Sequence, residues 1–114
     1  MLAELTIDLL GRGTHQSTDL AELLKIIDTS GLRYLLTPCG TCLEGEWDQV
    51  MDVVAKCHAR ALVISPHVLT TIRIEDEEGA VDKLTGNVKS VERAAGRLLG
   101  RLHPLPSGEG PDAV

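Results

Sequence analysis

The 114-residue sequence has very few aromatic residues: one tryptophan, one tyrosine and no phenylalanine. Proteins that bind single-stranded nucleic acid usually stack the bases on several aromatic rings, so this scarcity argues against such a function. The sequence also lacks an excess of basic charge, since 17 acidic residues outnumber 11 lysines and arginines and give a net charge of −6. Nucleic-acid phosphates require a basic face, and we therefore expect no nucleic-acid partner.

Long apolar runs are absent as well. No stretch reaches the length of a membrane span, and the opening MLAELTIDLL has neither a basic start nor a cleavage site, so we expect no membrane association. Three cysteines, an odd number, in a chain without a secretory signal indicate reduced thiols and a cytoplasmic protein. The hydrophobic content of 43% is enough for the core of one domain.

Four segments show the pattern of β-strands. In residues 3–10 apolar and polar side chains alternate, which is typical of a strand with one buried face. Residues 33–37 and 40–44 indicate two strands connected through Pro38-Cys39-Gly40. Residues 68–75 alternate again and predict a fourth strand.

Three segments have helical periodicity. The first follows a candidate cap at residues 17–19 and ends before Gly31, which suits a left-handed C-cap. The second spans residues 46–62 and the third residues 87–102. The side chains expected to point inward are, in turn, Leu20, Leu23, Leu24 and Ile27; Trp47, Val50, Met51, Val54, Cys57, His58 and Ala61; and Val88, Val91, Ala95, Leu98, Leu99 and Leu102.

The order of these elements predicts an α/β (α+β) fold. Strand, helix, two strands, helix and strand form the ferredoxin-like βαββαβ pattern, here with an additional C-terminal helix and an expected antiparallel sheet order 4-1-3-2. We predict a domain over residues 1–102. A disordered tail is expected over residues 103–114, which are rich in proline and glycine.

Two helices would cover only one face of this sheet. The other, open face would carry polar residues of the first, third and fourth strands: Glu4, Thr6, Asp8, Cys42, Glu44, Thr71 and Arg73. An uncovered sheet face usually meets a partner or a ligand. We therefore expect a homo-oligomer.

The cysteines raise the question of a metal or redox site. Cys39-x-x-Cys42 has the spacing of a zinc knuckle or a redox dithiol, but no second Cys-x-x-Cys or His-x-x-x-His completes a zinc site. A redox dithiol usually lies at a helix N-terminus, whereas these residues border a predicted strand. Cys57 and His58 are adjacent on a helix, about 100° apart, and converge poorly. We predict no metal site and no catalytic Cys–His pair.

Several segments carry a family resemblance. They are AELTIDLLGRGT, SGLRYLLTPCGTCLEGEWDQVMDVVAKCH, TTIRIED and VKSVE, of which GTCLEGEWDQVM is the most specific. The sequence resembles the YkoF-related thiamine-binding proteins from about residue 2 to residue 95. The resemblance implies a ferredoxin-like fold and a homotetramer built from sheet-to-sheet dimers. It also implies binding of thiamine or its hydroxymethyl-aminopyrimidine half, with no catalytic activity and no required cofactor.

The residues of the open face suit such a ligand. Carboxylates and threonine hydroxyls can pair with the amine and ring nitrogen of an aminopyrimidine, and net acidity favours a thiazolium cation. We predict a site near a subunit interface, with Glu44 and Thr41 as walls and with Thr6, Asp8 and Thr71 as hydrogen-bonding partners. Trp47 either stacks on the ligand or belongs to the core. The alternative is a regulatory domain of this fold that senses another metabolite, such as an amino acid.

Overall fold

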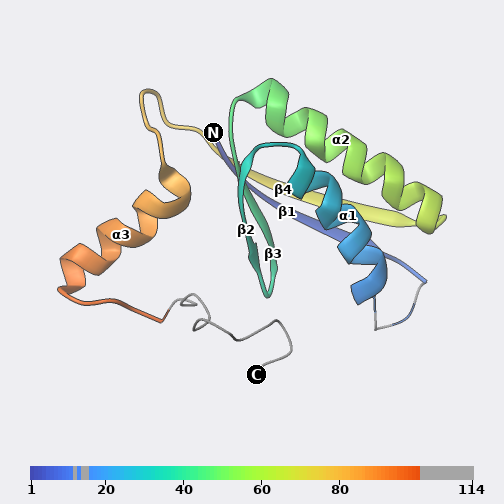
Figure 1. Ribbon diagram of the computed structural model, residues 1–114, viewed down its shortest axis with the longest axis horizontal. Coiled ribbons are helices and arrows are strands. Elements are labelled where there is room, and N and C mark those ends of the chain that lie inside the picture. The colour runs from blue at the N-terminus through green and yellow to red at the C-terminus, as the bar shows by residue number, and fades with distance from the viewer. Residues whose placement is uncertain (12, 14–15, 101–114) are drawn as a thin grey trace.

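Four strands and three helices make up the computed structural model, which describes residues 1–11, 13 and 16–100. In chain order the elements are β1 (Leu2–Leu9), α1 (Ser17–Thr29), β2 (Arg33–Thr37), β3 (Gly40–Glu44), α2 (Trp47–Ile64), β4 (Val68–Glu75) and α3 (Lys83–Ala95). The strands form one antiparallel sheet in the order β2-β3-β1-β4 (Figure 1). This confirms the predicted order 4-1-3-2 and the ferredoxin-like pattern.

The sheet has one buried and one open face, as the alternation in β1 predicts. Ala3, Leu5 and Leu9 are at most 3% exposed, whereas Asp8 is exposed. Cross-strand neighbours point to the same face, so Glu4 of β1 shares the open face with its partners Cys42 and Arg73. The open face therefore contains the polar residues that the alternation predicts for it.

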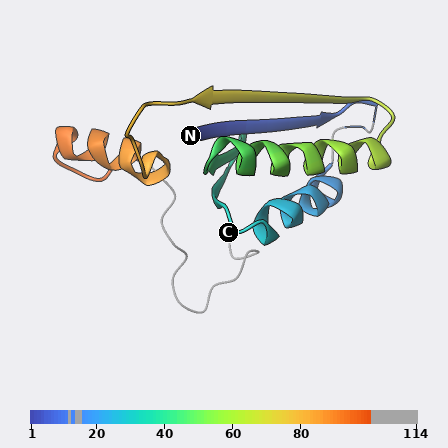
Figure 2. The ribbon, with the colours of Figure 1, turned by 90° about the horizontal axis from the view of Figure 1, so that it is seen from above.

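Helices α1 and α2 lie together on the buried face of the sheet, and both views show them on the same side of β1 and β4 (Figures 1 and 2). Their apolar stripes meet the sheet in a core that includes Leu23 and Ile27 of α1 and Val50 and Cys57 of α2. α2 begins with a capping box between Glu46 and Gln49. The described residues include no helix long and apolar enough to cross a membrane.

Two details of the helices differ from the prediction. Trp47 does not belong to the inward stripe of α2; it is 53% exposed because it occupies the first position of the helix, beyond the edge of the core. α1 begins at Ser17, and the residue before it, Gln16, makes no side-chain cap but donates to the carbonyl oxygens of Leu9 and Gly13.

His58 forms a hydrogen bond with the hydroxyl of Thr70 at 2.6 Å, which ties α2 to β4.

The third helix is the largest departure from prediction. It spans Lys83–Ala95 rather than residues 87–102, because Gly96 takes a left-handed conformation (φ 73°) that ends it. Its apolar residues do not point into the core: Val88 is 40% exposed and Val91 is 59% exposed. α3 stands apart from α1 and α2 (Figures 1 and 2). Leu102 and the predicted tail lie outside the described residues.

Candidate ligand-binding site

A cavity of about 660 Å³ lies between α1 and the β2–β3 hairpin, on the helix-covered side of the sheet. Most of its wall is aliphatic, with Leu20 and Leu24 from α1 and Leu36 from β2. A volume of this size, with an apolar lining and a few polar groups, is typical of small-molecule sites. The lining residues come from β1, α1 and both strands of the hairpin, so the cavity is a space left between α1 and this part of the sheet.

Gly40 brings the hairpin turn close to β1. A Cβ at this position would lie 2.8 Å from the carbonyl oxygen of Leu5 and 3.1 Å from the hydroxyl oxygen of Thr6. Any other residue would therefore push the turn away from β1. Thr6 donates to the carbonyl oxygen of Cys39 at 3.5 Å and so ties the turn to β1 from the other side. The end wall of the cavity depends on this close approach.

Thr41 provides a polar group on the inner wall. Its side chain points to the helix side of the sheet, like its cross-strand neighbours Leu5 and Leu36, and it is 4% exposed. Its hydroxyl has no hydrogen bond to any described residue. Every fully enclosed side-chain nitrogen or oxygen of the described residues has a partner, so this oxygen must reach the cavity. A hydroxyl that opens into a cavity without a protein partner is a group that a ligand or water satisfies.

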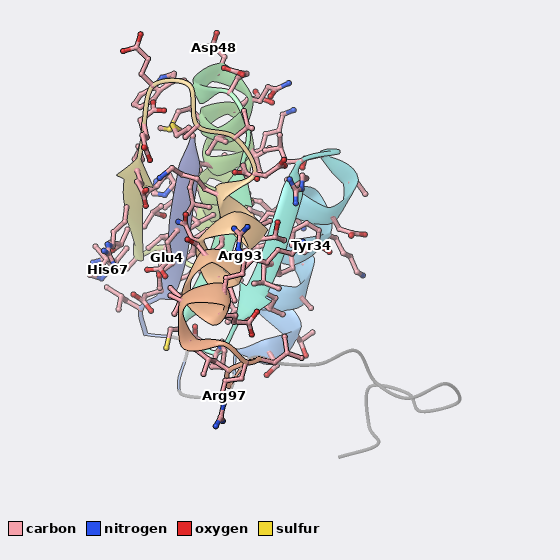
Figure 3. The ribbon with its side chains drawn as sticks, turned by 90° about the vertical axis from the view of Figure 1, so that its left-hand side faces the viewer. Glu4, Tyr34, Asp48, His67, Arg93 and Arg97 are labelled. Carbon is pink, nitrogen blue, oxygen red and sulfur yellow. The ribbon has the colours of Figure 1, made fainter. Side chains whose placement is uncertain are left out.

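The rim of the cavity is charged at one end. Tyr34 of β2 donates its hydroxyl to the carboxylate of Asp28 on α1 at 2.6 Å, and this bond raises the pKa of Tyr34. Lys25, three residues before Asp28 on α1, also lines the rim. Asp28 and Lys25 are exposed, whereas Tyr34 is half-buried. Figure 3 labels Tyr34 beside α1, well away from Glu4 on β1.

The predicted site residues do not form one cluster. Thr6 and Thr41 line the cavity. Asp8 and Glu44 lie near opposite ends of the sheet: Glu44 pairs with Leu2 and Asp8 with Leu69, which separates them by about 20 Å at about 3.4 Å per residue. Glu44 and Thr41, three residues apart on one strand, point to opposite faces.

Glu44 has a partner within its own chain. One carboxylate oxygen accepts the backbone N–H groups of Lys83 at 2.6 Å and Leu84 at 3.3 Å, and the other accepts from Arg33 at 3.3 Å. These N–H groups belong to the first turn of α3, which has no side-chain cap at Asp82. Glu44 therefore caps α3 from a distant strand and holds the helix on the sheet.

Thr71 and Trp47 also lie away from the cavity. Thr71 is exposed on β4, opposite Thr6. Trp47 is exposed at the start of α2. Neither residue lines the cavity, and they belong to different elements, Trp47 to α2 and Thr71 to β4.

The residues of α1 and β2 were absent from the predicted site. Leu20, Leu24 and Asp28 follow one another at four-residue intervals, which puts Asp28 one turn further along the inward stripe of α1. Tyr34 and Leu36 alternate with exposed residues in β2, which places both on the helix side. These two periodicities indicate which side chains point toward the helix side of the sheet. They do not indicate which helix lies over the hairpin, so they could not identify the cavity.

The three cysteines occupy different environments. Cys39 is exposed in the hairpin turn and lines the cavity, and Cys42 lies on the open face. Burial, and then the nearby charge of Glu4, raises the pKa of the Cys42 thiol. Burial raises the pKa of Cys57 to about 11. Among the described residues no group of three or more His, Cys, Asp or Glu side chains could hold a metal ion.

Comparisons with known proteins agree with this fold. The UPF0045 protein sll0230 of Synechocystis sp. is 27% identical over 93 residues, which cover 81% of this chain and 77% of that protein. The crystal structure of hypothetical protein MJ1052 from Methanocaldococcus jannascii is 21% identical with a TM-score of 0.74, covering 79% of this chain and 93% of that one. A candidate thiamine biosynthesis/salvage protein (TM0486) from Thermotoga maritima is 16% identical with a TM-score of 0.71, covering 79% and 96%.

These structural similarities show the shared fold. A family model described as thiamine-binding protein matches residues 3–92, which is most of the sequence and takes in β2, β3, β4 and nearly all of β1. The chain therefore belongs to the thiamine-binding protein family.

Proposed function

We propose that this protein binds thiamine, or its hydroxymethyl-aminopyrimidine half, reversibly in the cavity between α1 and the β2–β3 hairpin, without catalysing a reaction. Family membership supports the ligand class. The observation that carries the location is Thr41, a residue only 4% exposed that lines the cavity and whose hydroxyl has no hydrogen bond to a described residue. The site would keep Thr6 and Thr41 of the predicted residues and would lie within one chain.

The wall of the cavity suits a flat heteroaromatic ring. A threonine hydroxyl can donate to a ring nitrogen or accept from an exocyclic amine, so Thr41 matches either edge of an aminopyrimidine. The aliphatic side chains of Leu20, Leu24 and Leu36 would bury the ring faces. The one thiol on the wall, Cys39, is not accompanied by a histidine among the described lining residues, which supports binding without nucleophilic chemistry.

Calorimetry with thiamine and the free aminopyrimidine tests the proposal. Thr41→Val keeps the shape of the side chain but loses the hydroxyl, and we expect about tenfold weaker binding of both ligands. Thr71→Val is the matched control, because Thr71 is exposed on the open face. The affinity of this variant for both ligands should stay within about twofold of the wild-type value. Wild-type protein that binds neither ligand at millimolar concentration would refute the proposal.

The same titration separates the alternative function. A metabolite-sensing domain of this fold would bind a different ligand in the same cavity, and a panel of amino acids would reveal it. Mass spectrometry of the natively purified protein gives an independent result, because a tightly bound molecule would travel with the chain. An amino acid in place of thiamine would favour the sensing domain.

We also propose that the chain forms a cytoplasmic homo-oligomer through the open face of its sheet, with two dimers forming a tetramer. Leu35 and Leu69 are 50% and 52% exposed on this face. A second copy would bury these side chains. Light scattering should give a multiple of the 12.3 kDa chain mass, and Leu69→Asp should reduce it. Val63→Asp on α2, 71% exposed, is the control.

A further inference from the structure

The cavity has a neutral inner wall and a charged rim. The side chains that reach deepest, Leu5, Leu23 and Ile27, are at most 3% exposed, and the polar group among them is Thr41. The charged residues that line the cavity, Lys25 and Asp28, are both exposed on α1. A ligand with two chemically different ends would therefore meet two different environments.

We propose that Asp28 and Tyr34 form a specificity-determining subsite for a cationic ring, and that the ligand binds with its neutral aminopyrimidine against Thr41 and its thiazolium at this rim. The proposal rests on the thiamine-binding function proposed above. The subsite would select heteroaromatic ligands that carry a permanent positive charge at one end.

Desolvation decides the orientation of the ligand. A permanent cation on the aliphatic inner wall would lose its hydration without gaining a counter-charge, which is far more costly than burying a neutral ring with one hydrogen bond. At the rim the cation keeps part of its water and lies beside a carboxylate. Tyr34 is one of only two aromatic residues in the chain, and its ring can add a cation–π contact at the same place.

The hydrogen bond from Tyr34 orients the carboxylate of Asp28 and leaves it able to accept further hydrogen bonds. The phenol donates to Oδ1 of Asp28 at 2.6 Å, and an ionised carboxylate has further lone pairs for a second partner. The bond also holds α1 and β2 together across the rim, so the negative charge has a defined position. A positioned charge discriminates between ligands better than a freely rotating one.

Lys25 allows the sign of the electrostatic effect on ligand binding to be tested. Its ammonium group lies on the same helix and lines the same cavity, so it opposes a cationic ligand wherever Asp28 attracts one. Removing the two charges should change thiamine affinity in opposite directions. The neutral aminopyrimidine should respond to neither change, because it carries no charge at neutral pH.

Calorimetry of four full-length proteins tests this assignment with thiamine and the free aminopyrimidine at low salt. For Asp28→Asn we expect thiamine binding about 3- to 10-fold weaker, a range set by the exposure of the carboxylate, with the pyrimidine within about twofold. Lys25→Gln should bind thiamine about 2- to 5-fold more tightly. Asp52→Asn is the control: it removes the same charge from an exposed site on α2 that pairs with Lys56.

The outcomes distinguish the subsite from the function. If Asp28→Asn weakens both ligands equally, or neither, while wild-type protein binds both, the subsite is wrong and the thiamine-binding function stands. If wild-type protein binds neither ligand, both proposals fail. Thermal melts identify a folding defect, and Lys25→Gln, whose predicted effect is a gain of affinity, keeps the test valid even if Asp28→Asn is unstable.

Discussion

Replacing Glu44 by alanine should release α3 while leaving the ligand cavity intact. The Glu44 side chain is 12% exposed, and its carboxylate accepts the N–H groups of Lys83 and Leu84 and a guanidinium N–H of Arg33. Loss of a helix cap costs about 0.5–2 kcal/mol, and loss of a negative charge at a helix N-terminus costs about 0.3–1 kcal/mol. The two together give about 1–3 kcal/mol for the attachment of α3.

That loss should be visible locally. α3 has 13 residues, and an isolated helix of this length is marginal in water, so its attachment decides whether it stays folded. A loss of about 1–3 kcal/mol corresponds to a population of the open form about 5- to 150-fold higher. Hydrogen exchange followed by mass spectrometry should show faster exchange across residues 83–95 and unchanged protection in α2.

Thiamine affinity provides the second readout for Glu44→Ala. Because Glu44 points to the face opposite Thr41, affinity should stay within about twofold. Glu44→Gln keeps an acceptor oxygen and should release α3 less than alanine does. Unchanged exchange in α3 would refute the capping role. Lost thiamine binding with normal exchange would instead restore Glu44 as a ligand residue and move the site to the open face.

Two further perturbations test the geometry of the cavity. Gly40→Ala should lower the free energy of unfolding by about 1–3 kcal/mol, because its Cβ would collide with a β1 carbonyl oxygen, and urea titration measures this loss. Gly86→Ala is the control: nothing lies within 4 Å of its Cβ position, so it should not destabilise the protein. Thiol alkylation at pH 8 should proceed at Cys39 first, more slowly at Cys42, whose pKa is raised, and not at Cys57, whose pKa is about 11. Thiamine should protect Cys39 alone, and protection of Cys42 would place the ligand on the open face.

The sheet could be predicted because its signals are local. Alternation assigns both faces of β1 and β4, and Pro38-Cys39 between two short apolar runs marks the hairpin. The order of strands then follows from the βαββαβ pattern. Each of these inferences needs only the residues within one or two neighbouring elements.

The third helix could not be placed in this way. Apolar residues after Gly96 continue the helical periodicity and conceal its end, and its start depends on Glu44, which lies 39 residues before Lys83. The same limit applies to the site. Alternation identifies Glu44 as a carboxylate that requires a partner, but it does not show whether that partner is a ligand or the backbone of α3.

The cavity was missed for a related reason. Thr41 appears in the predicted site, but only the folded structure shows that it lines a cavity beside α1. Asp28 and Tyr34 belong to different elements and meet through a hydrogen bond that neither segment indicates alone. Sites formed where a helix crosses a hairpin depend on tertiary packing that sequence periodicity does not encode.

Chemical-shift mapping tests the central claim most directly. Thiamine would be titrated into ¹⁵N-labelled full-length protein, and amide shifts would be followed on both faces of the sheet. We predict saturable shifts at Thr41, Tyr34 and along α1, with Thr71 and Arg73 on the open face unmoved. Shifts confined to the open face, or none at millimolar thiamine, would contradict a ligand site between α1 and the β2–β3 hairpin.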